Sequence, residues 1–243
     1  NPNFKLYENN FVLGKTNKEN DEFDSIVLVP RDIKIEKVTL PKFIKKIDCF
    51  AFDCCQNIKE IEISENSELQ IIDKYAFANS SIEKVSISPS VTEISSYVFT
   101  KCENLPAVEI PESSKLKKLG IYAFGESAIE KFTIPPHLTE ISEGTFSNCK
   151  QLKTVEFHPN SELTIICKEA FASSSIEKFT IPPHLTEICE KAFEFCNQLQ
   201  TVETAPNSEL RTIGKESFSK SSIQKFTIPP HLTEICDFAF DRC

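Results

Sequence analysis

The chain has 243 residues, 40% of them hydrophobic, and a formal net charge of −9. Its acidic balance argues against nucleic acid as a partner, because binding to phosphates draws its affinity from clustered lysine and arginine side chains. No apolar run approaches the ~20 residues that a membrane-spanning helix requires, and the sequence shows no signal peptide.

The first 36 residues lack the regularity of the rest of the chain. Short apolar stretches alternate there with polar ones, which predicts two β-hairpins joined by turns. The expected strands are 4–7, 11–13 and 26–29, and the expected turns are 8–10 and 17–21. We therefore interpret residues 1–36 as an irregular β-hairpin region, either a modified repeat or an N-terminal extension, and residues 37–243 as one repeat array.

The clearest evidence for a repeat array is an eight-residue sequence motif. Ile-Pro-Pro-His-Leu-Thr-Glu-Ile occurs unchanged at 134–141, 181–188 and 228–235, each copy 47 positions after the last. Weaker versions begin at Leu40 and Ile87. Repetition at an interval of this size is typical of a solenoid, in which each unit buries its apolar face against its neighbours.

A small residue followed by phenylalanine occurs twice in each period, with alternating gaps of 25 and 22 residues. These landmark phenylalanines are Phe52, Phe77, Phe99, Phe124, Phe146, Phe171, Phe193, Phe218 and Phe240. The repeating unit is therefore a coil of about 23 residues in a shorter and a longer form. We expect the nine rings to fill the core, where burial of each contributes roughly 1.5–3 kcal/mol.

Each coil also contains an apolar–polar–apolar triplet, such as Val85–Ile87 or Phe132–Ile134. This alternation predicts a short strand with one face turned inward. Strands that recur every 23 or 24 residues in the same direction cannot be hairpin partners. We expect nine of them to stack as one parallel sheet.

The segments Leu152-x-x-Val155-x-Phe157 and Ile176-x-x-Phe179-x-Ile181 resemble the L-x-x-L-x-L core of leucine-rich repeats. The fuller pattern, a strand followed by Pro, Leu-Thr-Glu-Ile, Ala-Phe and Cys-x-x-Leu, resembles the BspA-like subclass over residues 38–243. The resemblance implies a mainly β, right-handed solenoid with a concave parallel sheet of about nine short strands and a convex side of turns or short helices. It also implies a protein of the cell surface or a secreted one.

The chain contains no methionine, begins with asparagine, and stops at Cys243 just after a landmark phenylalanine. Solenoids normally end in polar caps, and neither end of this sequence has one. We therefore expect a fragment of a longer array.

Five of the ten cysteines follow a landmark phenylalanine by three residues: Cys55, Cys102, Cys149, Cys196 and Cys243. Neighbours in this column are two coils apart, about 10 Å, whereas a disulfide needs Cα atoms within roughly 7 Å. They are predicted to be free thiols on the core side. Cys167 and Cys189 lie on consecutive coils, about 5 Å apart, where both a disulfide and two reduced thiols are open alternatives. The absence of any C-x-x-C pair argues against a zinc site.

The histidines His137, His184 and His231 also recur every 47 residues. At about 10 Å they are too far apart to share one metal ion, so we interpret them as surface loop residues. The sequence has no phosphate-binding loop, nucleophile elbow or other singular constellation of catalytic groups. It predicts no catalytic residue, no cofactor and no metal.

The polar residues of the triplets and those just before them should form two exposed columns across the sheet. The candidate binding residues on this concave face are Lys84, Glu109, Lys131, Thr133, Glu156, Lys178, Thr180, Glu203 and Lys225. Strands about 4.8 Å apart would place each lysine beside glutamates of the neighbouring strands. The alternatives are a lattice of ion pairs that keeps the sheet soluble and a polar platform that binds a partner. Tyr7, Arg31 and Asp32 lie in the irregular first 36 residues and could determine the specificity of binding instead.

The leading hypothesis is a non-catalytic binding array. The family resemblance implies adhesion at the cell surface, with a protein or glycoprotein ligand of the host or the extracellular matrix. The alternatives are a cytoplasmic interaction scaffold of the same fold, an enzyme, and a spacer.

Overall fold

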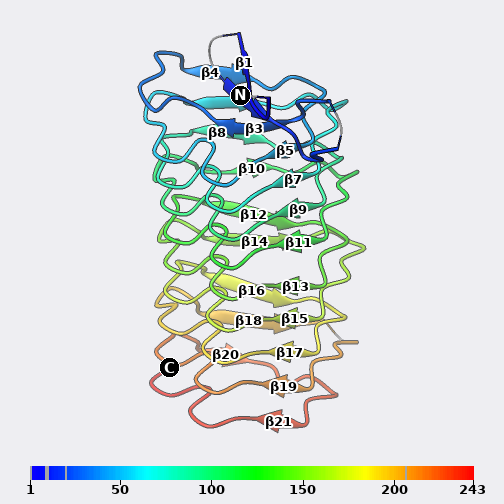
Figure 1. Ribbon diagram of the computed structural model, residues 1–243. Coiled ribbons are helices and arrows are strands. Elements are labelled where there is room, and N and C mark those ends of the chain that lie inside the picture. Colours follow the sequence, from blue (N-terminus) through cyan, green and yellow to red (C-terminus); the bar gives the residue numbers. More distant parts are fainter. Residues whose placement is uncertain (1, 9–10, 20, 206) are drawn as a thin grey trace.

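The computed structural model describes residues 2–8, 11–19, 21–205 and 207–243, and these form a single stack of coils with the N-terminus at one end (Figure 1). The regular structure in these ranges consists of strands, with no helix. The side away from the strands is therefore built from turns in these ranges, not from the short helices that the family resemblance also allowed. The predicted turns at 8–10 and 17–21 include Asn9, Asn10 and Asn20, which lie outside the described residues.

The triplets form nine strands, which we call the triplet ladder. They are β4 (Lys37–Thr39), β6 (Glu60–Glu62), β8 (Lys84–Ser86), β10 (Val108–Glu109), β12 (Lys131–Ile134), β14 (Thr154–Phe157), β16 (Lys178–Ile181), β18 (Thr201–Thr204) and β20 (Lys225–Phe226). Each pair of bonded strands is parallel, as the repeat predicted.

The expectation of one continuous sheet is wrong. The triplet ladder is divided into β4-β6-β8-β10, β12-β14 and β16-β18-β20, so it is open between β10 and β12 and between β14 and β16. The first opening follows β10, which has two residues and lies between Pro106 and Pro111 in the sequence. At the other opening, the ring of Phe157 packs edge-on against Phe179 at 5.7 Å, where other strands carry a smaller side chain.

A second ladder, which the sequence patterns did not predict, runs beside the first. Its strands have two residues each: β5 (Lys46–Ile47), β7 (Ile71–Ile72), β9 (Glu93–Ile94), β11 (Lys118–Leu119), β13 (Glu140–Ile141), β15 (Ile165–Ile166), β17 (Glu187–Ile188), β19 (Thr212–Ile213) and β21 (Glu234–Ile235). The second residue of each strand is apolar, and it is buried in all of these strands but the last. This ladder is also interrupted once, between β11 and β13.

The N-terminal strands continue the second ladder. β1 (Lys5–Tyr7), β2 (Phe11–Gly14) and β3 (Ser25–Leu28) pair antiparallel in this order, and β3 then pairs in parallel with β5. The first region thus contacts the array through a shared sheet.

Turns with a left-handed residue form a third hydrogen-bonded column. Tyr75 and Asn79, for example, have φ of 58° and 53°. Backbone amides of one turn donate to carbonyls of the next, as from Phe52 to Ala76 at 2.7 Å and from Phe124 to Thr145 at 2.9 Å. This column continues across both openings of the triplet ladder, and so it holds the coils together where that ladder does not.

The landmark phenylalanines form a continuous stack inside the coils. Successive ring centroids lie between 4.9 and 5.4 Å apart, for example 4.9 Å for Phe52 and Phe77 and 5.3 Å for Phe146 and Phe171. Eight of the nine side chains are at most 1% exposed, and Phe240 in the last coil is partly buried. The predicted aromatic core is confirmed.

Candidate functional site

All nine candidate residues of the triplet ladder have exposed side chains. They lie on the outward side of the strands because their neighbours in the triplets, such as Val85, Phe132 and Phe179, point into the core. The structure therefore places the candidate residues on one face, as the alternation predicted.

The predicted ion-pair lattice is present in part. Lys37 lies 3.5 Å from Glu60 and 3.4 Å from Glu62, and Lys84 lies 3.6 Å from Glu60. Lys178 and Glu203 form the best defined pair, at 2.8 Å. Exposed pairs of this kind contribute little stability, about 0–1 kcal/mol each. Their effect is to keep the charged side chains of these strands engaged with one another.

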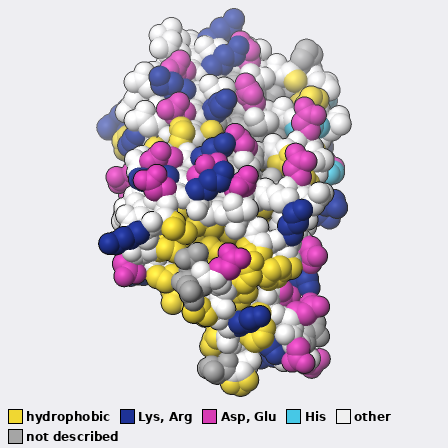
Figure 2. Space-filling model, turned by 90° about the horizontal axis from the view of Figure 1, so that it is seen from above, with side chains coloured by type: hydrophobic (Ala, Val, Ile, Leu, Met, Phe, Trp, Pro, Cys, Tyr) yellow, Lys and Arg dark blue, Asp and Glu magenta, His cyan; other side chains and the backbone are white. Residues whose placement is uncertain are grey.

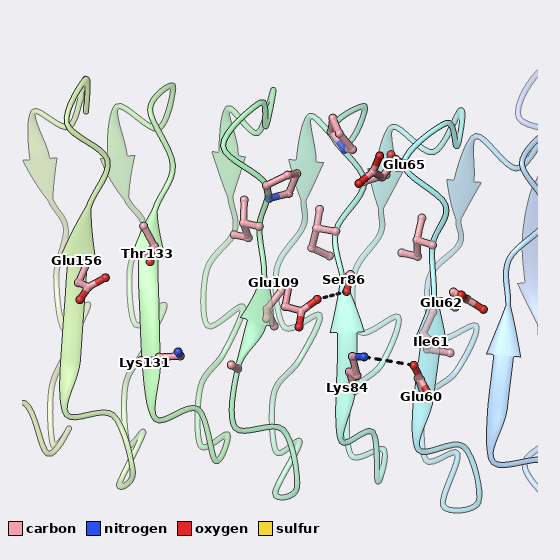
Figure 3. A pocket seen from close by; sticks show the side chains of 18 residues that line it. Glu60, Ile61, Glu62, Glu65, Lys84, Ser86, Glu109, Lys131, Thr133 and Glu156 are labelled. Carbon is pink, nitrogen blue, oxygen red and sulfur yellow. Dashed lines mark hydrogen bonds and ion pairs between the residues drawn. The ribbon is translucent and has the colours of Figure 1, made fainter.

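The middle of the face differs. Among the described residues, neither Lys131 nor Glu156 has an ion-pair or hydrogen-bond partner, although the same strand register joins Thr133 to Glu156 and Thr180 to Glu203. In Figure 3, Lys131 turns toward the β10 side and Glu109 turns toward Ser86, to which it is hydrogen bonded. Lys131 thus turns away from Glu156, and Glu109 turns away from Lys131, so the alternation of charges along the strands produces no ion pair here.

A groove of about 630 Å³ crosses this part of the face (Figure 3). Its lining includes Lys84, Glu109, Lys131, Thr133 and Glu156, which are five of the nine candidate residues. Ala107 also lines it, at a position where other strands carry lysine, glutamate or threonine. The small side chain leaves Val108 beneath it partly uncovered, with 9% exposure.

A second groove, of about 720 Å³, lies one period further along, at the end of the strands where the Pro-Pro-His loop begins. It is lined by apolar side chains including Val155, Phe157, Ile181, Pro182 and Pro183. Glu156 and Thr180 are the candidate residues that line it. Grooves with apolar walls and a few polar groups are typical of binding sites.

The cysteine column is buried as predicted, apart from Cys243 in the last coil, and all ten cysteines are free. The thiol of Cys149 donates to the carbonyl of Phe124 at 3.0 Å, and Cys102 donates to Phe77 at 3.1 Å. Burial raises the pKa of Cys102 and of Cys149 to about 12. These thiols act as core side chains with a satisfied donor.

Cys167 and Cys189 follow the paired strands β15 and β17, in which Ile166 is opposite Ile188. Both are partly exposed. Interaction with Cys189 lowers the pKa of Cys167, and the same interaction raises the pKa of Cys189. The structure brings the two thiols together in their reduced form.

The histidine column is exposed, and each of two histidines has a glutamate on the next coil. Nδ1 of His137 lies 3.2 Å from Glu162, and Nδ1 of His184 lies 3.1 Å from Glu209. Within the described ranges no three metal-ligating side chains come together to hold an ion. The same ranges contain no helix long and apolar enough to cross a membrane.

An aromatic column that sequence reasoning missed lies at the surface of the turns. Phe50, Tyr75, Tyr97 and Tyr122 stack with centroid distances of 4.9, 4.7 and 5.6 Å. Each stands two residues before a landmark phenylalanine, and this fixed offset was the signal that could have revealed it. The rings cover one another, so their edges face outward and their faces do not.

The irregular N-terminal region and the neighbouring Phe43 contain a further apolar surface. Phe4, Leu6, Leu28 and Phe43 are between 41% and 58% exposed, and Tyr7 packs edge-on against Phe43 at 5.9 Å. Seen from the N-terminal end, hydrophobic side chains gather on one part of the molecule and charged ones surround it (Figure 2). Two other residues of this region, Arg31 and Asp32, are exposed, and Arg31 forms an ion pair with Asp53 at 3.0 Å.

Comparison with known proteins agrees with this architecture. A family model described as a BspA type leucine rich repeat region matches residues 31–143 and 117–243 in six copies. The chain resembles the crystal structure of a leucine-rich repeat protein from Bacteroides ovatus with a TM-score of 0.74 at 22% identity, covering 96% of this chain and 58% of that one.

It also resembles the pneumococcal vaccine antigen PcpA, with a TM-score of 0.57 at 20% identity, covering 82% of this chain and 58% of that one. A leucine-rich repeat protein of T. pallidum has a TM-score of 0.58 at 18% identity, with 88% and 87% covered. No curated protein matches the chain. At these identities the structures show a shared fold, and the family model covers nearly the whole array. The chain therefore belongs to the BspA type leucine-rich repeat family.

Proposed function

We propose that this protein is a non-catalytic binding array that uses the triplet ladder to hold a protein or glycoprotein partner at the cell surface. The observation that carries the proposal is the groove of about 630 Å³ across β6 to β14, with five of the nine candidate residues in its wall. Exposed charged and hydroxyl side chains repeat along this face at the strand spacing, so one partner can contact several coils at once.

The composition of the face fits an extended contact better than a single anchor. Protein interfaces with concentrated hot spots favour Trp, Tyr and Arg, and the nine candidate residues are lysine, glutamate and threonine. Each coil then contributes a weak interaction, and affinity comes from several coils engaged together. A surface location is supported by the family and by the likeness in fold to the pneumococcal vaccine antigen.

Two measurements test this proposal. Antibody raised against the array should label intact cells, because a surface protein is accessible without permeabilisation. Purified array should bind an immobilised extracellular-matrix extract, and Lys84→Glu combined with Lys178→Glu should weaken that binding at least fivefold. Labelling only after permeabilisation would contradict the location, and unchanged binding by the double variant would contradict the use of this face.

The second candidate is a cytoplasmic interaction scaffold of the same fold. The ten free cysteines favour it, since exported proteins tend to form disulfides. Thiol titration of protein isolated without reductant separates the two: ten free thiols favour the cytoplasm, and a bridge between Cys167 and Cys189 favours export.

A further inference from the structure

The two openings of the triplet ladder are equivalent places in successive periods. β10 is not paired with β12, and β14 is not paired with β16, while the strands on either side of each opening are paired normally. Val108 and Val155, which precede the openings, are 9% and 8% exposed, compared with 0% for Val85 and 1% for Val202. Each opening therefore uncovers core surface that the rest of the ladder hides.

Both openings lie in the grooves described above. Val108, Ile110 and Pro111 line the first groove, and Val155, Phe157 and Ile181 line the second. An apolar side chain of a partner can be buried against either set of residues, with a favourable free energy proportional to the apolar area that it removes from water. The two openings are thus a pair of apolar subsites on an otherwise polar face.

The pair of strands between the subsites carries charges that no described residue neutralises. β12 and β14 are the triplet-ladder strands between the openings, and they carry Lys131 and Glu156, which have no partner among the described residues. Lys131 points toward the first opening in Figure 3. A partner that reaches from one opening to the other must pass over this lysine and then over this glutamate.

The distance between the subsites selects the conformation of that partner. Two coils separate them, which is about 10 Å at the usual strand spacing. In an extended β-strand the residues on one face are about 7 Å or about 13 Å apart, so neither spacing fits. In a polyproline II helix every third residue returns to the same face after about 9 Å. That conformation matches the separation of the openings.

We propose that the two openings bind a peptide in the polyproline II conformation, lying across β12 and β14, with apolar side chains three residues apart. The two residues between them are one acidic and one basic, and they pair with Lys131 and Glu156. This inference rests on the proposed function, because it assigns a partner chemistry to the same face. The polyproline II backbone is already extended before binding and has no internal hydrogen bonds to break. Such a peptide therefore binds with little loss of conformational entropy.

The probe is a fluorescent peptide, Pro-Pro-Leu-Glu-Arg-Leu-Pro-Pro, measured by fluorescence anisotropy against the whole chain. A peptide of the same composition, Pro-Pro-Leu-Glu-Leu-Arg-Pro-Pro, has leucines two residues apart and should bind at least tenfold more weakly. A helical peptide with leucines seven residues apart tests the other conformation that spans this distance, and tighter binding of it would overturn the proposal.

Three variants locate the contact. Lys131→Glu should weaken binding of the probe at least fivefold and make the protein prefer a peptide with two arginines between the leucines. Lys225→Glu is the matched control, since Lys225 is exposed in the same column and also lacks an ion pair among the described residues. It should leave binding unchanged. Val155→Phe should fill the second opening and weaken binding tenfold, and it should fold because Phe132 and Phe179 occupy the same position in other coils.

Equal binding of the two leucine spacings, or equal effects of the two lysine variants, would overturn the proposal. That result leaves the proposed function standing if the array still binds the matrix extract through Lys84 and Lys178. If the array bound neither the peptide nor the matrix extract, the proposal that the triplet ladder is a binding face would be wrong.

Discussion

The hydroxyl of Tyr122 donates a hydrogen bond of 3.2 Å to Oε2 of Glu169, a residue two coils further along the array. The coil between them carries Gly144 at the equivalent position, and a Cβ there would lie 2.4 Å from the Tyr122 ring. The aromatic column on the turns therefore ends at Tyr122, and the missing side chain of Gly144 lets the ring reach a carboxylate beyond its immediate neighbour.

Gly144→Ala should destabilise the protein by about 2–3 kcal/mol, because the new methyl group collides with the Tyr122 ring. The φ of +59° at Gly144 adds about 1 kcal/mol of that cost. The positive φ is not the main cause of the expected destabilisation, since Tyr97 and Glu169 adopt a similar φ in their coils. Urea unfolding of Gly144→Ala measures the effect. In a Tyr122→Ala background the same change should cost about 1 kcal/mol, and an equal cost in both backgrounds would show that the ring is not involved.

Stability should fall between about pH 10 and pH 12, and Tyr122 should account for part of that fall. Burial and the neighbouring Glu169 raise the pKa of Tyr122 to about 12 from an ordinary value of 10.0. Over this range the unfolded chain loses the phenolic proton while the folded chain keeps it, so rising pH favours unfolding. Thermal melts at several alkaline pH values should show a shallower decline for Tyr122→Phe. An unchanged decline would contradict the assignment.

Phe171→Ala should cost about 3–5 kcal/mol, because it leaves a cavity in the middle of the phenylalanine stack. Phe171 is fully buried and stacks on Phe146 and Phe193 at 5.3 and 5.0 Å. Phe195→Ala is the control: its ring is 43% exposed and has Lys220 Nζ 4.1 Å from its centroid, a contact worth about 0.5–1 kcal/mol. Chemical denaturation of both variants should separate them clearly, and a loss below 1 kcal/mol for Phe171→Ala would remove the stack from the core.

The cysteines should fall into a slow and a fast class when native protein is treated with a thiol-labelling reagent. Cys102, Cys149 and Cys196 should label only on unfolding, since they are buried and burial raises the pKa of each. Cys167 should label fast, because interaction with Cys189 lowers its pKa.

Diamide, a reagent that oxidises pairs of thiols, should link Cys167 to Cys189 by a disulfide within one chain. The diamide accepts the two electrons and two protons that the thiols release. Peptide mapping under non-reducing conditions identifies the bridge, and Cys167→Ser should abolish it. Bridging of Cys102 to Cys149 instead would contradict the placement of the coils.

The period alone was enough to predict the solenoid, the core phenylalanines and the exposed candidate residues. These features depend on which side of a coil a residue occupies, and the position within a repeat determines that. Phe171 and Lys178 could therefore be placed from the sequence, because every coil treats their positions in the same way.

The openings and the unpaired charges could not be predicted in this way. Lys131-Phe-Thr-Ile134 and Lys178-Phe-Thr-Ile181 have the same sequence, yet Lys178 pairs with Glu203 while Lys131 turns away from Glu156. Both β12 and β16 follow an opening of the triplet ladder, so the difference lies in how the side chains turn and not in the pairing with the preceding strand. A repeat pattern describes each coil by itself, and the contact between two coils depends on residues that vary from one coil to the next.

Both ladders are interrupted between the coil of β10 and β11 and the coil of β12 and β13, while the turn column crosses that boundary with the bond from Phe124 to Thr145. A pulling force along the axis would act on this boundary unevenly, because the turn column still connects the two coils on one side and the ladders do not connect them on the other. The two halves should separate there first and close again when the tension is released, so an array of this kind can extend under tension without unfolding completely.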